Sequence, residues 1–185
     1  GGHSAALLAN DDKIIIFGGW SNSTQFADMW IFDIANNCWI ETEVTHEIPR
    51  WYHCGLIVPA IPSWKYFIFG GSVGNFEEGG NRTLSRLNDE TYVLDMNVKS
   101  LKSLKWEPIS LETADKPRSR ENSAMFYDSN ESRLVLFGGW ANNWLDDIHA
   151  LSVSLITGPP YAIYDIKPKL GPLTGKTKIY ITGDG

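Results

Sequence analysis

The sequence predicts an all-β fold that is built from three copies of a four-stranded antiparallel unit. One pattern, an apolar strand that runs into two glycines, occurs at residues 13–20, 65–72 and 133–140. Short apolar stretches separated by turn residues lie before and after each copy, as in an antiparallel meander. Three copies of one such unit indicate a repeat architecture, in which each repeat buries its faces against its neighbours.

The bulk composition agrees with a packed domain and limits the kinds of partner. The 185 residues are 43% hydrophobic and 12% aromatic, which suffices for a core. The net charge of −6 argues against a nucleic-acid surface, which would be basic. No stretch reaches the roughly 18 apolar residues that span a membrane, so we predict no membrane insertion.

The first unit covers residues 1–44, and the spacing of its apolar stretches predicts four strands. The two glycines at positions 18 and 19 are expected to end the second of them. Nearly every residue of that second strand is apolar, which predicts that both of its faces are buried. The four expected strands are His3–Leu8, Lys13–Phe17, Asp28–Asp33 and Cys38–Ile40.

The second and third units cover residues 45–111 and 112–156. In the second unit we expect strands at Arg50–Val58, Lys65–Phe69, Glu90–Asp95 and around Trp106. In the third unit we expect strands at Asn122–Tyr127, Arg133–Phe137 and Asp147–Ser152.

The spacing aligns the three units and reveals one large insertion. From His3 to Gly18 there are 15 positions, from His53 to Gly70 there are 17, and from Asn122 to Gly138 there are 16. The gap between the second glycine and the third strand is 9 residues in the first unit, 19 in the second and 8 in the third. The second unit therefore carries about ten extra residues directly after its two glycines.

These residues resemble the kelch repeat, in which one repeat forms one four-stranded blade of a β-propeller. The resemblance covers about 155 residues, and its third copy departs from the pattern because His149 and Ser152 replace an aromatic residue and an acid. The diglycines correspond to Gly18, Gly19, Gly70, Gly71, Gly138 and Gly139. The first aromatic position corresponds to Trp30 and Tyr92, and the second to Trp39 and Trp106.

The resemblance implies a partial propeller with a structural role for these repeat residues. Glycine tolerates positive φ, so we expect each diglycine to make room for a tryptophan of its own or the next blade. Three blades are fewer than the four to eight, approximately, that close a ring. We therefore expect the chain to be an interior part of a longer protein, with more blades before residue 1 and the rest of an immunoglobulin-like β-sandwich after residue 185.

The composition changes after residue 156. Thr157-Gly-Pro-Pro160 reads as a stiff linker. The segment that follows resembles the opening of an immunoglobulin-like IPT/TIG domain, with its Gly171-Pro172 turn, although Lys176 replaces a glycine of that pattern. Ile179 and Ile181 alternate with polar residues, which predicts a half-buried strand.

The candidate binding residues lie in the insertion of the second unit. Loops on a rigid scaffold often carry binding residues. We expect that deleting Asn75 to Arg86 leaves the fold intact but weakens partner binding. A tolerated surface insertion is the alternative interpretation. The candidate residues are Phe76, Glu77, Glu78, Arg82, Arg86 and Leu87.

A catalytic alternative starts from Tyr52-His53. Kelch propellers followed by an immunoglobulin-like domain also resemble the copper-radical enzymes of the galactose-oxidase family. Those enzymes use such a Tyr-His pair together with a Tyr joined to a Cys. His3 occupies the same repeat position as His53, which favours a structural strand residue that satisfies a neighbouring backbone group. His46 and His149 are isolated in sequence, so we predict no metal and no other cofactor.

The function that the sequence favours is that of a non-catalytic scaffold that binds other protein subunits of a large complex, without a small-molecule substrate. A kelch array that passes directly into an IPT-like segment resembles the N-terminal tail of outer-arm axonemal dynein heavy chains. That resemblance implies a cytoskeletal assembly element in the cilium or axoneme, and leaves open whether the parent chain is a microtubule motor ATPase.

A third alternative is an extracellular adhesion or receptor ectodomain. Asn22, Asn81 and Asn130 each begin an N-glycosylation acceptor pattern. The only two cysteines, Cys38 and Cys54, read as reduced strand residues, which favours a cytoplasmic location.

Overall fold

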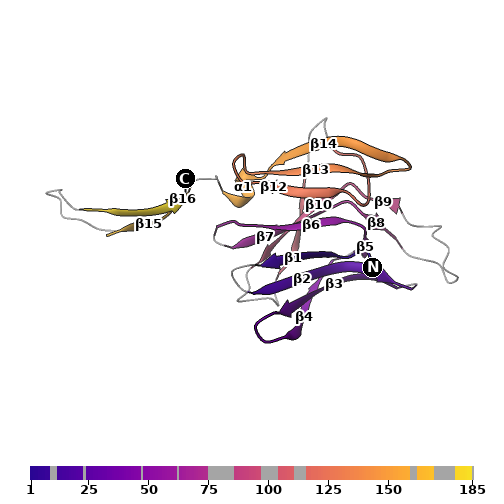
Figure 1. Cartoon of the computed structure of the whole chain (residues 1–185), viewed down its shortest axis with the longest axis horizontal. Helices are drawn as coiled ribbons and strands as arrows, with labels where there is room; N and C mark the ends of the chain where they lie inside the picture. Colours follow the sequence, from indigo (N-terminus) through magenta and orange to yellow (C-terminus); the bar gives the residue numbers. More distant parts are fainter. Residues whose placement is uncertain are drawn as a thin grey trace.

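The computed structural model describes residues 1–8, 12–22, 24–46, 48–61, 63–74, 86–96, 104–110, 116–158, 162–168 and 178–184. It confirms the predicted fold class, because almost every element in this part of the chain is a strand of an antiparallel sheet. Three sheets stack on one another as successive blades (Figure 1), and the first strand of the second blade contacts the first strands of the other two.

Blades 1 and 2 have four strands each, and three strands of blade 3 are described. Blade 1 consists of β1 (Ser4–Leu8), β2 (Lys13–Ser21), β3 (Thr24–Asp33) and β4 (Cys38–Thr45). Blade 2 consists of β6 (Cys54–Val58), β7 (Trp64–Phe69), β10 (Thr91–Met96) and β11 (Trp106–Ile109). Blade 3 consists of β12 (Ala124–Asp128), β13 (Arg133–Trp140) and β14 (Trp144–Ser152).

Three smaller elements complete the described structure. The single strand expected at the start of the second unit is two strands, because β5 (Arg50–Trp51) leaves blade 2 and forms a small sheet with β8 (Ser72–Val73) and β9 (Arg86–Leu87). A one-turn helix, α1 (Ser154–Thr157), follows blade 3. Strands β15 (Ala162–Lys167) and β16 (Tyr180–Asp184) pair as a hairpin.

The register of the first two strands of each blade fixes which residues are equivalent. Ser4, Cys54 and Ala124 each pair with the phenylalanine that precedes the diglycine of their blade. The equivalent of His53 in blade 3 is therefore Ser123, and the alignment on Asn122 is wrong by one residue.

In blades 1 and 3 the diglycines do not end the second strand, whereas in blade 2 strand β7 ends at Phe69, directly before Gly70. Strands β2 and β13 continue through them to Ser21 and Trp140, with a register shift between the phenylalanine and the second glycine. Strand β2 continues through its diglycine because Gly18 and Gly19 adopt positive φ values of +65° and +99°. These values bend the strand, and its pairing with β3 resumes at Gly19.

The diglycines also make room for backbone and not for tryptophan. A Cβ at Gly18 or Gly70 would lie 2.7 or 2.6 Å from the carbonyl oxygen of the arginine that opens the next blade, Arg50 or Arg120. A Cβ at Gly71 would lie 2.7 Å from the carbonyl oxygen of Trp51 in its own blade. The chain that enters blades 2 and 3 thus passes directly over Gly18, Gly70 and Gly71, and no side chain larger than hydrogen fits beneath it.

Burial of both faces was expected for β2, but there Ile15 and Phe17 are buried while Ile14 and Ile16 are only partly buried. The strand that is buried on both faces is β7. Its side chains alternate, so Tyr66 and Ile68 pack in the core shared with blade 1, whereas Phe67 packs in the core shared with blade 3. Each core is filled by the inward faces of two neighbouring blades. The two tryptophans at the second aromatic position differ, because Trp39 is 55% exposed whereas Trp106 packs against the first of these cores.

Candidate functional site

A buried hydrogen-bond network joins blades 1 and 2. The Ser4 hydroxyl lies 2.6 Å from His53 Nε2 and 2.5 Å from the Tyr66 hydroxyl. His53 was expected to satisfy a backbone group, but its described partner is this side chain from the first strand of blade 1. The network therefore positions neighbouring blades, and all three of its side chains are buried.

Two fully buried arginines, Arg50 and Arg120, occupy equivalent positions at the entry to blades 2 and 3. Arg120 donates to both carboxylate oxygens of Asp147 at 2.5 and 2.7 Å and to the Gly138 carbonyl at 3.0 Å. This guanidinium holds the pKa of Asp147 well below its usual range.

Arg50 has weaker partners than Arg120. It donates to the Gly70 carbonyl at 3.3 Å, and its guanidinium lies 4.0 Å from Glu90 and 5.1 Å from the centre of the Tyr92 ring. Within the described residues, its Nε and Nη2 atoms are buried without a hydrogen-bond partner. The charge of Arg50 is therefore compensated by Glu90 and Tyr92 at longer distances than those between Arg120 and Asp147.

The residues of the copper-enzyme alternative do not form a metal site in the described structure. His53 Nε2 is occupied by Ser4, and Cys38 lies exposed on the outer strand of blade 1. Within the ranges given above, no group of three or more His, Cys, Asp or Glu side chains is placed to hold a metal ion.

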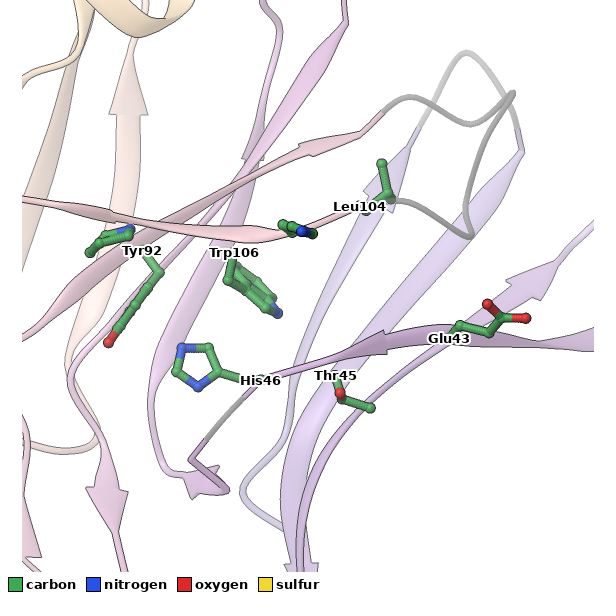
Figure 2. Close-up of a pocket in the computed structure, with 8 residues that line it drawn as sticks. Glu43, Thr45, His46, Tyr92, Leu104 and Trp106 are labelled. Atoms are coloured by element: carbon green, nitrogen blue, oxygen red, sulfur yellow. The ribbon is translucent and has the colours of Figure 1, made fainter.

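A cavity of about 470 Å³ lies between blades 1 and 2. Its size falls in the roughly 300–1,000 Å³ range of ligand pockets. His46 follows the last strand of blade 1, and Trp106 begins the last strand of blade 2 (Figure 2). The cavity is lined by Glu43, Thr45, His46, Tyr92, Leu104, Lys105, Trp106 and Pro108.

The aromatic rings at this cavity pack on one another. The His46 ring lies edge-on to Tyr92 at 4.4 Å and is tilted against Trp106 at 5.9 Å between ring centres. Trp106 in turn packs against Phe17 at 4.8 Å and Tyr66 at 5.6 Å. The inner wall of the cavity is therefore the edge of the core that blades 1 and 2 share.

The hydrogen bonds of His46 determine its protonation. Its Nδ1 atom accepts the backbone N–H of Ile48 at 3.0 Å, so in the neutral ring Nε2 carries the hydrogen. Burial and the charge of Arg50 lower the pKa of His46 to about 4, so the ring is neutral at pH 7. Neither His46 Nε2 nor the indole nitrogen of Trp106 has a hydrogen-bond partner among the residues described.

We expect the stability of the chain to fall as the pH drops from 7 to 5.5. Burial lowers the pKa of His46 to about 4 and of His53 to about 3, whereas both titrate near 6.5 when unfolded. The unfolded chain therefore binds more protons in this range, which lowers the free energy of unfolding by about 1.3 kcal/mol for each histidine. Urea unfolding at several pH values measures this slope.

A variant that lacks one of these histidines provides the control for the pH effect. His46→Gln should lose about half of the slope, while Trp39→Phe, at an exposed position without a titrating group, should retain it. A wild-type free energy of unfolding that stays constant between pH 7 and 5.5 would show that neither histidine is held neutral.

The structure describes only part of the candidate loop. Phe76, Glu77, Glu78 and Arg82 lie outside the described residues. Arg86 and Leu87 form β9, which pairs with β8. Ser72 of β8 donates to Glu121 at 2.5 Å, so the small sheet at the base of the insertion is attached to the entry of blade 3.

The sequence alone did not identify the cavity. In the sequence His46 is an isolated histidine, and Trp106 corresponds to a structural position of the kelch repeat. The sequence contains one signal for this region, which is a longer connection before the closing tryptophan of the second unit. Trp106 follows Asp95 by 11 positions, whereas Trp39 follows Asp33 by 6.

Comparison with known proteins identifies relatives along almost the whole chain. The family model described as the KLHDC2/KLHL20/DRC7 Kelch-repeats domain matches residues 1–156. The flagellar outer-arm dynein alpha chain of Chlamydomonas reinhardtii is 31% identical over 175 residues, which are 93% of this chain and 4% of that protein. Acyl-CoA-binding domain-containing protein 4 of Arabidopsis thaliana is 27% identical over 82% of this chain and 20% of its own length.

This chain thus spans only a small fraction of the length of these relatives. Among the described residues, no helix has the length and apolar character needed to cross a membrane.

Proposed function

Because the chain belongs to the KLHDC2/KLHL20/DRC7 kelch-repeat family, we propose that it is a non-catalytic interaction segment in the tail of a ciliary outer-arm dynein heavy chain. In this role the blades bind other subunits of the motor complex. The chain acts in the cilium or axoneme, and any ATPase activity belongs to other parts of the heavy chain.

One observation carries this proposal. The similarity to the Chlamydomonas dynein alpha chain covers 93% of the chain, whereas residues 1–156 are the only part that the kelch-repeat family model matches. The shared sequence therefore includes residues after blade 3, where the hairpin of β15 and β16 is found. We propose that this hairpin begins an IPT/TIG-like domain, so that the order of domains is that of the dynein tail as well.

The binding surface in this proposal is the insertion between β8 and β9. Its base is a three-stranded sheet in which Arg50–Trp51, Ser72–Val73 and Arg86–Leu87 pair side by side. This base is joined to blade 1 through the backbone N–H of Tyr52, which donates to the Gly2 carbonyl at 2.8 Å. A loop on such a base can present side chains to a partner while the blades stay rigid.

We expect deletion of residues 75–85, which keeps β8 and β9, to reduce recovery of outer-arm dynein subunits by at least tenfold. The measurement is affinity purification of the tagged chain from ciliated cells, followed by quantitative mass spectrometry. Deletion of residues 98–102, within the second and weaker candidate insertion at Asn97 to Lys105, is the comparison and should reduce recovery less.

Two results would contradict the proposal. If the intact chain recovers no outer-arm dynein subunit, the assignment to the dynein tail is wrong. If both deletions reduce recovery equally, the insertion is not the binding surface.

A further inference from the structure

We propose that two copies of this chain associate head to tail and close a six-bladed ring. In this ring the outer face of blade 3 in one copy packs on the outer face of blade 1 in the other. The two faces lie at opposite ends of the stack of blades (Figure 1). The proposal goes beyond the proposed function and does not depend on it.

The first observation is an apolar outer face on blade 3. Phe137 and Ile148 lie directly opposite each other on β13 and β14, and they are 48% and 68% exposed. On the same face, Phe126 of β12 is 55% exposed and pairs with Val135. A terminal repeat that faces water needs a polar outer face to stay soluble. The outer face of blade 3 is therefore suited to contact with another apolar surface.

The equivalent positions in the other two blades are buried. In blade 1, Phe17 takes the place of Phe137 and is fully buried. Met29 takes the place of Ile148 and is also fully buried, and both side chains pack in the core shared with blade 2. In blade 2, Phe69 precedes the diglycine in the same way and is 4% exposed. The face that is free on blade 3 is thus the one on which blade 1 carries the next blade.

The second observation is an apolar outer face on blade 1, on the side that is turned away from blade 2. A row of directly opposed apolar residues crosses all four strands of this blade, and both of its ends are 55% exposed. Its two middle residues are only partly buried. The row consists of Leu7, Ile14, Phe32 and Trp39.

The third observation is that these two free faces correspond to the two faces that already meet between blades 1 and 2. In that interface Phe17 packs on Trp106, with 4.8 Å between ring centres. Trp106 has the same place in blade 2 that Trp39 has in blade 1. A second copy can therefore repeat this contact, with Phe137 of one chain packed on Trp39 of the other.

The number of blades favours a closed ring of two copies. An interface between two different faces of a protein generates either a ring or an open filament. Each copy brings three blades, and approximately four to eight blades close a propeller. Two copies therefore suffice for a ring, which covers both free faces of each copy through two identical interfaces.

The test measures the mass of the isolated chain in solution by light scattering after size-exclusion chromatography. We expect twice the mass of one 20.7 kDa chain at micromolar concentrations. Ile148→Lys places a charge on the face of blade 3, and Trp39→Glu places one on the face of blade 1. Each should weaken the association at least about a hundredfold, because a charge buried without a partner is costly. Both positions are exposed in the single chain, so both variants should fold.

Substitutions at Ile61 make the same changes in charge away from both faces. Ile61 lies between β6 and β7 of the middle blade and is 51% exposed. Ile61→Lys and Ile61→Glu should leave the dimer intact. A mixture of Ile148→Lys with Trp39→Glu should form dimers again, because the mixed pair has one interface of two unsubstituted faces and opposite charges at the other.

Four results would overturn the proposal. A chain that stays single at every concentration would show that other surfaces, such as further blades of the same polypeptide, cover these faces. Loss of the dimer in only one of the two face variants would show that one face pairs with itself. An assembly larger than a dimer would show that the ring does not close, and equal losses in the Ile61 variants would show a general effect of charge. None of these measurements involves residues 75–85 or dynein subunits, so failure of this proposal is distinguishable from failure of the proposed function.

Discussion

Replacing Gly70 with alanine is expected to lower the free energy of unfolding by about 4 kcal/mol. Gly70 has a φ of +68°, which an alanine adopts only at a cost. The new Cβ would also lie 2.6 Å from the Arg120 carbonyl oxygen. That oxygen cannot move away freely, because it accepts the backbone N–H of Gly71 at 2.9 Å. Urea unfolding followed by tryptophan fluorescence measures the change.

Gly138→Ala is the matched control for this prediction. Gly138 occupies the same repeat position with a similar φ of +60°, but the nearest atom to its Cβ would be the Leu145 carbonyl oxygen at 3.0 Å. We expect this variant to lose about 2 kcal/mol, mainly for the backbone conformation. Equal losses in the two variants would show that the contact with the next blade contributes nothing to the effect.

Arg120→Ala is expected to destabilise the chain by about 3 kcal/mol. The substitution removes a guanidinium that is completely buried and leaves the Gly138 carbonyl without this donor. It also removes both hydrogen bonds to Asp147, a residue that stays partly exposed and therefore solvated. The same urea unfolding experiment measures the loss.

Arg133→Ala provides the comparison for Arg120. Arg133 pairs with Asp128 at 3.0 Å, but its side chain is 45% exposed. Such surface pairs contribute about 0–1 kcal/mol, so we expect a small change. A loss for Arg120→Ala no larger than that for Arg133→Ala would contradict the view that the buried arginine stabilises the entry to blade 3.

The sequence predicted the repeated all-β fold because its signals are local. Within each unit the diglycine follows the start of the first strand by 15 to 17 positions, so strand order could be derived without any tertiary contact. The same reasoning misjudged the ends of β2 and β13. A glycine pair is a common end of a strand, and only the pairing partner shows that the strand continues.

Of the two candidate regions, the sequence revealed the insertion but not the cavity. The insertion after Gly71 was visible as a break in spacing, although Phe76, Glu77, Glu78 and Arg82 lie outside the described residues. The cavity at His46 and Trp106 was not visible, because its two walls are 60 residues apart in sequence and meet only when blade 2 packs on blade 1.

By itself, then, the sequence determined the repeat, the strand order and the position of the glycines, since each depends on residues that are near neighbours along the chain. Only the tertiary structure decided what those glycines face. The carbonyl oxygens of Arg50 and Arg120 come from the next blade and lie where a Cβ at Gly18 or Gly70 would be. The packing of the blades also buries the charge of Arg50 and the N–H groups of His46 and Trp106 that lack a described partner. No single repeat determines this burial.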